Sequence, residues 1–352
     1  MMLKEKGLMS QMKTAAYFQS HGFLVRNGVK LAIAAGATEV TDIDVLALRF
    51  STPLSEERLV VDCKDRKRPK PFERILWTIG LSTFSHANRG VVVLPNAPWR
   101  AREFASQAKV EVLCLPEIER HLDSVKDSAI GFGEANSLLL NQKDSIIRKL
   151  AERGRYLLRD DLIVRQMLVR GHPITNLNRL IQLLSSHGKT PKETNRDAEW
   201  LRRYICFNAA VTAGTMLVRF ASESKWTPQD DWSDYARKKL TYGDIPPQKA
   251  TQLAKLALER EFYGGLPKPV YTEEIIEVMN LLILKQKIAS LVPYALDFHL
   301  LGDMLLKMKD GYISPILGEL QVEVLKLCKQ ILSVLAYAAE IPNDIWTKMP
   351  TT

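Results

Sequence analysis

The feature that most constrains the fold is a pair of strand-like runs, residues 38–50 and 58–64, in the first fifth of the chain. Both runs are rich in β-branched and apolar residues. Gly36 precedes the first run, and Pro53 and Ser55 lie in the polar loop between the two. Runs this close in sequence pair naturally as a hairpin. The sequence therefore predicts a β-sheet organised around this hairpin.

Each run carries a carboxylate beside an apolar stretch. Asp44 comes directly before Val45-Leu46-Ala47-Leu48, and Asp62 ends the stretch Leu59-Val60-Val61. Asp62 and Lys64 share a face because alternate residues of a strand point the same way. In a hairpin, two carboxylates and one ammonium therefore converge at one end.

Such a group of side chains suits a divalent metal ion. The carboxylates of Asp44 and Asp62 and the backbone carbonyl of Cys63 are hard oxygen ligands, the type that Mg²⁺ or Mn²⁺ prefers. A lysine beside the metal, here Lys64, orients or deprotonates a water molecule and neutralises charge on a phosphate.

The pattern Asp44…Asp62-Cys63-Lys64 resembles the PD-(D/E)xK nuclease superfamily, which includes restriction endonucleases and archaeal-type Holliday junction resolvases. The flanking residues, Thr41 to Ala47 and Val61 to Lys64, are similar to its restriction-endonuclease-like members. The resemblance implies a metal-dependent DNA endonuclease that hydrolyses phosphodiester bonds. It assigns Asp44, Asp62 and Lys64 as catalytic, with Asp44, Asp62 and the Cys63 carbonyl holding the metal.

The sequence departs from the superfamily pattern at two places. Thr41-Asp42-Ile43 replaces the proline before Asp44, and Gln11 stands where many members place a glutamate in the first helix. One metal with Lys64 is therefore the expected mechanism. Asp42 and Glu39 alternate with Asp44, so each is either an additional ligand or part of a solvated strand end.

The elements around the hairpin predict an α/β restriction-endonuclease-like domain at 1–125, a mixed sheet flanked by helices. In chain order these elements are a helix at 3–21, a strand from 23 toward 33, the hairpin, a helix from Pro71, a strand at 91–94, a helix from Pro98 to Ala108 and a strand at 110–115. Phe72, Ile75, Leu76 and Ile79 form one apolar stripe on the second helix.

A run of basic residues follows the catalytic lysine and is a candidate for contacts with DNA phosphates. Its members are Arg66, Lys67, Arg68 and Lys70, with Arg74 extending it onto the next helix. The alternative is a solvated loop, which is the usual state of a charge run.

Residues 126–352 show only helical periodicity and predict an all-helical domain. A wide apolar stripe marks the segment from Pro315 to Ala339. Either this domain mediates self-association or docking of a protein partner, or the stripe lies inside a monomeric bundle.

Composition gives weaker indications of the partners and the location of the protein. The formal net charge of +9 permits an anionic partner such as DNA. The four cysteines are far apart, and neither a signal peptide nor a transmembrane segment is evident, so we expect a cytoplasmic protein that does not bind membranes. Besides an endonuclease, including one that is the effector of a defence or mobile-element system, the sequence allows a catalytically silent nuclease-like module that binds nucleic acid or serves in assembly.

Overall fold

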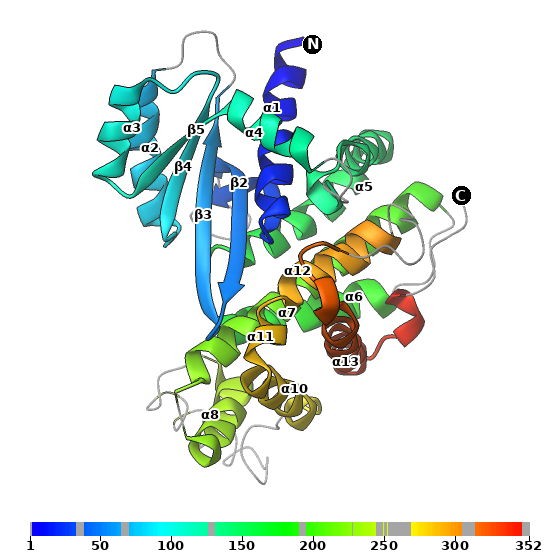
Figure 1. Ribbon diagram of the computed structural model, residues 1–352. Coiled ribbons are helices and arrows are strands. Elements are labelled where there is room, and N and C mark those ends of the chain that lie inside the picture. The colour runs from blue at the N-terminus through cyan, green and yellow to red at the C-terminus, as the bar shows by residue number, and fades with distance from the viewer. Residues whose placement is uncertain are drawn as a thin grey trace.

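A computed structural model describes residues 2–32, 39–64, 70–125, 131–189, 195–226, 228–243, 249, 252, 269–304 and 314–346. Its N-terminal part is a five-stranded mixed sheet flanked by helices (Figure 1). The strands are β1 (Leu24–Ala32), β2 (Glu39–Ser51), β3 (Ser55–Cys63), β4 (Arg89–Leu94) and β5 (Val110–Cys114). The helices are α1 (Met2–Ser20), α2 (Pro71–Phe84), α3 (Trp99–Ser106) and α4 (Leu115–Ser124).

The strands lie in the sheet in chain order. β1, β2 and β3 form an antiparallel meander, and β4 and β5 then add in parallel through the α2 and α3 crossovers. This order of helices and strands confirms the one predicted from the sequence. β4 is covered on both faces, which explains its uninterrupted apolar run.

Different helices pack on the two faces of the sheet. Val25, Val45 and Val61 belong to a cluster with α1 and α4. The alternate residues Leu24 and Leu46 belong instead to the core of the C-terminal helices. A third cluster packs α2 and α3 against β4 and β5. The sheet is therefore a middle layer, and part of one face is buried only by the second half of the chain.

The second half is helical throughout its described residues, as predicted. Its longer elements are α5 (Ser137–Met167), α6 (Pro173–Lys189), α7 (Arg196–Ser224), α8 (Gln229–Tyr242), α10 (Thr272–Leu284), α11 (Gln286–Ala289), α12 (Val292–Asp297) and α13 (Gln321–Ala339). A π-helix, η2 (Phe298–Met304), follows α12, and short 3₁₀ helices are η1 (Gly133–Ala135), η3 (Gly318–Leu320) and η4 (Asn343–Trp346). A further helical segment expected at 249–262 lies almost wholly outside the described residues.

Helix α7 is the centre of this half. By length and composition it is apolar enough to cross a membrane, but 94% of its apolar window is buried inside the protein. It packs against α5, α6, α10 and α12. A helix that is apolar all round is expected at such a central position, so packing within the protein accounts for its hydropathy.

Buried polar contacts tie the sheet to the helices. Arg26 on β1 is fully buried, and its guanidinium donates to Asp297 on α12 (2.8 Å) and to Asn208 on α7 (2.9 Å). Glu134 accepts from the backbone N–H of Asn27 (2.9 Å) and from Arg165 Nη1 (2.7 Å). Charged groups remain in such an interior only when they are paired. The predicted boundary at 125/126 therefore lies between a part with strands and helices and a part with helices, but residues of both parts pack in one core cluster.

The apolar stripe expected at the C-terminus is internal. Val324, Leu327, Ile331 and Leu335 are buried, and Val334 is partly buried against the same core. This stripe therefore offers no exposed apolar face for a second copy of the chain.

Candidate active site

The candidate site lies where the sheet divides. β2 and β3 pair only as far as Val45 opposite Val61. Beyond that pair, β2 continues against β1, and β3 continues against β4 as far as Cys63. The gap between the two strands receives the side chain of Asp44, whose Oδ2 accepts the backbone N–H of Cys63 (2.8 Å).

The three predicted catalytic side chains meet in this gap. Lys64 Nζ lies 3.2 Å from Asp44 Oδ2 and 3.1 Å from Asp62 Oδ1. Asp44 and Asp62 are buried, whereas the Lys64 side chain remains 28% exposed. The ammonium therefore bridges two carboxylates and keeps contact with solvent.

Burial and charge set the protonation of this group. Burial raises the pKa of Asp44 above its ordinary value, and it outweighs the opposite effects of Lys64 and the Cys63 N–H. Burial lowers the pKa of Lys64, but the carboxylates of Asp44 and Asp62 prevail and the net shift is upward. Lys64 is therefore held as an ammonium, and its charge favours the ionised form of Asp44, which burial opposes.

Two further residues complete the site. Gln11 on α1 donates from Nε2 to Asp44 Oδ1 (2.7 Å). Arg74 on α2 donates from Nε to Asp62 Oδ2 (2.7 Å), and its Nη2 contacts the other oxygen of the same carboxylate. The sequence places Gln11 at the position of a family glutamate, but its bond to Asp44 depends on how α1 packs. Arg74 is predicted as a phosphate contact, which stays a prediction; its guanidinium binds the Asp62 carboxylate, a contact that the sequence did not predict.

The structure places the remaining predicted site residues outside this group or does not describe their side chains. Asp42 is exposed, and it makes none of the contacts that join Asp44, Asp62 and Lys64. Glu39 begins β2, but its side chain lies outside the described part of the chain, as do Arg66, Lys67 and Arg68. Lys70 is exposed and pairs with Glu73 (2.7 Å).

The backbone of Cys63 is oriented toward Asp44. The N–H of Lys64 donates to the Val93 carbonyl on β4 (3.0 Å). Backbone groups of successive strand residues point in opposite directions, so the N–H and carbonyl of Cys63 face the β2 side, which carries Asp44. Burial raises the pKa of the Cys63 thiol well above its usual range, so the sulfur stays protonated and only the carbonyl suits a metal.

The donor set fits one small, hard cation, subject to one rearrangement. Two carboxylates and a carbonyl are the ligand types of Mg²⁺ and Mn²⁺. Both oxygens of Asp62 are engaged by Arg74, so this guanidinium would have to move before Asp62 could bind a metal. Within the described residues there is no group of three or more His, Cys, Asp or Glu side chains placed to hold a metal. A metal at this position would therefore need backbone and water as its other ligands.

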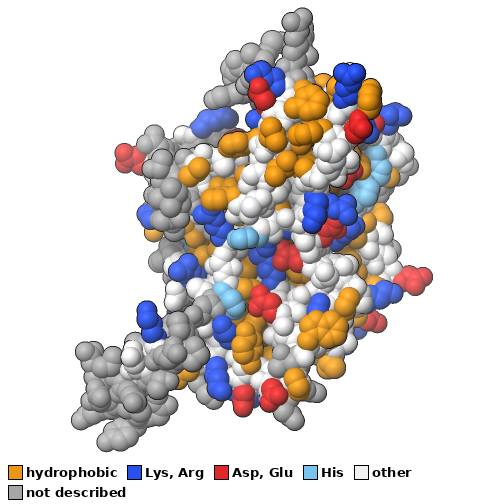
Figure 2. Space-filling model, turned by 90° about the vertical axis from the view of Figure 1, so that its left-hand side faces the viewer, with side chains coloured by type: hydrophobic (Ala, Val, Ile, Leu, Met, Phe, Trp, Pro, Cys, Tyr) orange, Lys and Arg blue, Asp and Glu red, His pale blue; other side chains and the backbone are white. Residues whose placement is uncertain are grey.

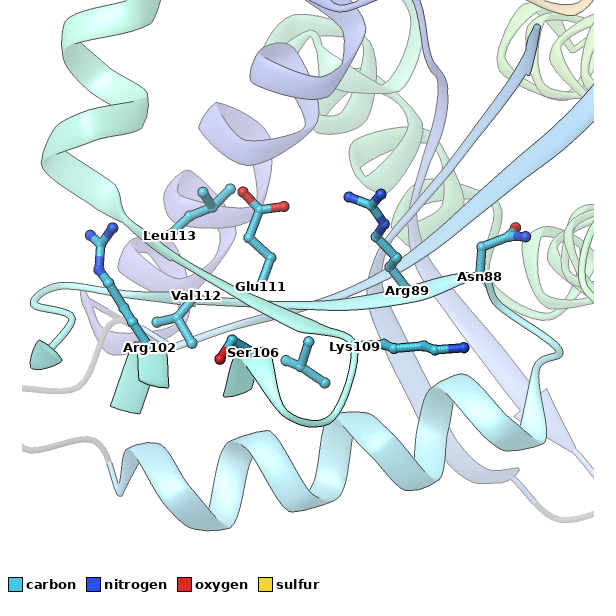
Figure 3. A pocket seen from close by; sticks show the side chains of 9 residues that line it. Asn88, Arg89, Arg102, Ser106, Lys109, Glu111, Val112 and Leu113 are labelled. Atoms are coloured by element: carbon cyan, nitrogen blue, oxygen red, sulfur yellow. The ribbon is translucent and has the colours of Figure 1, made fainter. Parts of the chain in front are cut away.

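A hollow open to solvent lies elsewhere, along the edge strand β5. Its volume is about 810 Å³. Figure 3 shows Arg89, Lys109 and Glu111 around it, from β4, β5 and the turn that leads into β5. None of the candidate catalytic residues lines this hollow. The candidate site lies instead at the end of the β2–β3 pairing, where two buried carboxylates meet a partly exposed lysine.

Comparison of the chain with protein-family models, with curated proteins and with solved structures finds no match. The functional argument therefore depends on the geometry of these residues and on the resemblance of the sequence motif.

Proposed function

We propose that the protein is a metal-dependent endonuclease of the PD-(D/E)xK type that hydrolyses phosphodiester bonds in DNA. The observation that carries the proposal is the bridge formed by Lys64 between Asp44 and Asp62 at the split between β2 and β3. Two buried carboxylates with one solvent-facing ammonium are unusual at a strand end, where water normally hydrates such charges.

In this proposal Asp44, Asp62 and the Cys63 carbonyl hold Mg²⁺ or Mn²⁺. The ion, when bound, polarises the scissile phosphate. Lys64 donates hydrogen bonds that orient the attacking water and offset the charge that develops on the phosphate oxygens. Gln11 fixes the rotamer of Asp44 through its hydrogen bond. The positive net charge of the chain favours the approach of DNA.

The test is cleavage of supercoiled, linear and branched DNA by the purified protein with Mg²⁺, Mn²⁺ or EDTA. We expect cleavage with either metal and none with EDTA. Asp44→Asn should lose activity, because it keeps the shape of the side chain and removes the charge. Asp42→Asn on the same strand should retain it, because Asp42 is exposed and makes none of the site contacts. Loss in Asp42→Asn with retention in Asp44→Asn would reassign the ligand.

A second candidate is a catalytically silent nuclease-like module that binds nucleic acid or serves in assembly. The observation that favours it is Arg74, which occupies both oxygens of Asp62. This reading predicts DNA binding that is equal in Mg²⁺ and in EDTA, and no cleavage of any of the three DNA forms. The same experiment therefore separates the two candidates.

A further inference from the structure

The solvent-facing side of α2 is apolar. Phe72, Leu76, Trp77 and Phe84 on this helix are 46%, 58%, 46% and 46% exposed. Trp99, at the start of the neighbouring α3, is 67% exposed. Figure 2 shows apolar side chains gathered on the upper half of the face that α2 and α3 present. We call Phe72, Leu76, Trp77 and Trp99 the aromatic patch.

The fold does not require this patch. The buried side of α2 consists of Ile75, Thr78 and Leu81, and the partly buried Arg74 and Ile79 add contacts to the sheet. The sequence stripe predicted on this helix is thus split: Ile75 points inward, whereas Phe72 and Leu76 point outward. Exposed apolar residues gathered on one surface usually mark a binding site, since scattered single residues are the norm elsewhere.

Cations accompany the aromatic rings. The guanidinium carbon of Arg74 lies 6.0 Å from the ring centre of Trp77, and that of Arg100 lies 5.6 Å from the ring centre of Trp99. Lys70 is also exposed at the start of α2, but it pairs there with Glu73 of the same helix (2.7 Å). Aromatic rings interleaved with basic residues are what proteins use to bind single-stranded nucleic acid: the bases stack on the rings and the cations follow the phosphates.

The patch is continuous with the candidate site. Arg74 binds Asp62 and at the same time lies beside Trp77. Phe72 packs edge-on against Phe104 of α3, with ring centres 5.4 Å apart, so the two helices form one surface. A strand that stacks on this surface therefore leads directly to the split between β2 and β3.

A second copy of the chain is a weaker explanation. In a symmetric dimer the same patch meets itself. Arg74 is already paired with Asp62, but Arg100 beside Trp99 would meet a second copy of the same cationic surface, whereas a nucleic-acid strand brings phosphates to it.

We propose that the aromatic patch binds unpaired nucleotides next to the scissile phosphate, so that the preferred substrate contains a single-stranded segment. This inference rests on the proposed nuclease function for the position of the cut, but the binding itself does not depend on catalysis.

The test is fluorescence anisotropy of a labelled oligo(dT) strand and of a labelled duplex of equal length, measured in EDTA to prevent cleavage. Trp77→Ala and Trp99→Ala should each weaken binding of the single strand by roughly tenfold, the loss expected for one stacked base. Binding of the duplex should change by less. Both residues are exposed, so circular dichroism should show an unchanged fold.

A matched control is Trp226→Ala. Trp226 is 80% exposed, and a lysine, Lys225, lies 5.6 Å from its ring centre, yet it stands after α7, away from α2. This variant should bind oligo(dT) as the wild type does. Equal binding by the wild type, Trp77→Ala and Trp99→Ala would overturn the inference. So would light scattering that shows a dimer which Trp77→Ala converts to a monomer, because the patch would then be a contact between copies.

The inference and the proposed function fail separately. If the wild type cuts DNA but Trp77→Ala binds oligo(dT) normally, the aromatic patch does not bind unpaired nucleotides, and the nuclease assignment stands. If oligo(dT) binding depends on Trp77 and Trp99 but no DNA is cut with any metal, the patch stands and the catalytic assignment fails.

Discussion

At the scale of single residues, the candidate site is a balance of charges. Two carboxylates, Asp44 and Asp62, face two cations, Lys64 and Arg74. A divalent ion added to this group would leave an excess of positive charge, so one cation has to withdraw. Arg74 is the one that blocks both oxygens of Asp62, and Lys64 is the one that the mechanism needs. Arg74 is therefore the group that we expect to move when metal binds.

This expectation predicts an effect of Arg74→Met, which keeps a long apolar side chain and removes the guanidinium. Because a charge-assisted hydrogen bond to Asp62 contributes about 1.5–3 kcal/mol, its removal should tighten Mn²⁺ binding roughly tenfold or more. Calorimetric titration with Mn²⁺ measures this. Arg100→Met, on α3 and apart from the carboxylates, should leave Mn²⁺ affinity unchanged. Weaker binding in Arg74→Met would show that the guanidinium supports the metal site.

At the scale of elements, α2 links the candidate site to the sheet. Its close approach to β4 depends on Gly90. A Cβ atom at this position would lie 2.5 Å from Thr78 Cγ2 and 2.8 Å from Ser82 Oγ, both on α2. Only a residue without a side chain lets the helix lie this near the strand. The position of Arg74 over Asp62 therefore depends on a glycine in a different element.

The prediction at this scale uses two glycines. Gly90→Ala should destabilise the protein by about 1–3 kcal/mol, because α2 has to shift or strain. Gly80→Ala, on the exposed side of α2 with no atom near its added Cβ, should instead stabilise by about 0.5–1 kcal/mol through higher helix propensity. Urea unfolding of both variants and of the wild type measures these changes in the free energy of unfolding. A neutral Gly90→Ala would mean that α2 does not pack closely on β4.

At the scale of the whole molecule, the sheet and the helices form one unit. Leu24 and Leu46 on the sheet pack into the core of the helical half, and the Arg26 guanidinium reaches Asp297 and Asn208 there. The Arg26–Asp297 ion pair and the apolar core thus bind the two parts of the chain together. Within the helical half, Asp161 has its pKa lowered to about 2: burial raises it, but Arg165 and Lys143 outweigh burial.

The shared core predicts that residues 1–125 do not fold alone. Without the helical half, one face of β1 and β2 would be exposed and Arg26 would be left without Asp297 and Asn208. Thermal unfolding followed by circular dichroism should give one cooperative transition for the full chain and none for the fragment. A fragment that unfolds cooperatively near the full-chain midpoint would show that the N-terminal part is an independent domain.

The sequence predicted the local features of this fold well, because they depend on local patterns. Alternating and continuous apolar runs indicated the strands, and Pro71 marked the start of α2. The meeting of Asp44, Asp62 and Lys64 follows in part from strand geometry, because the pairing of Val45 with Val61 brings the next residues of both strands to one end of the hairpin. The split between the strands, which admits the Asp44 side chain, was not predicted from the sequence. The contact of Arg74 with Asp62 and that of Gln11 with Asp44 arise where a helix crosses a sheet, and no local pattern encodes such a crossing. The exposure of Phe72 and Leu76 was also not predicted, because an apolar stripe in the sequence does not show which face of a helix is buried.

The most direct test of the central claim is the cleavage rate of Lys64→Met compared with the wild type. The measurement uses supercoiled DNA with saturating Mg²⁺ at equal protein concentration, with circular dichroism to confirm the fold. Because Lys64 bridges both carboxylates and faces the solvent, its loss removes the group that orients the water. The account predicts a rate at least about 100-fold lower, the usual contribution of such a catalytic group. A folded Lys64→Met variant that cuts DNA at the wild-type rate would contradict it.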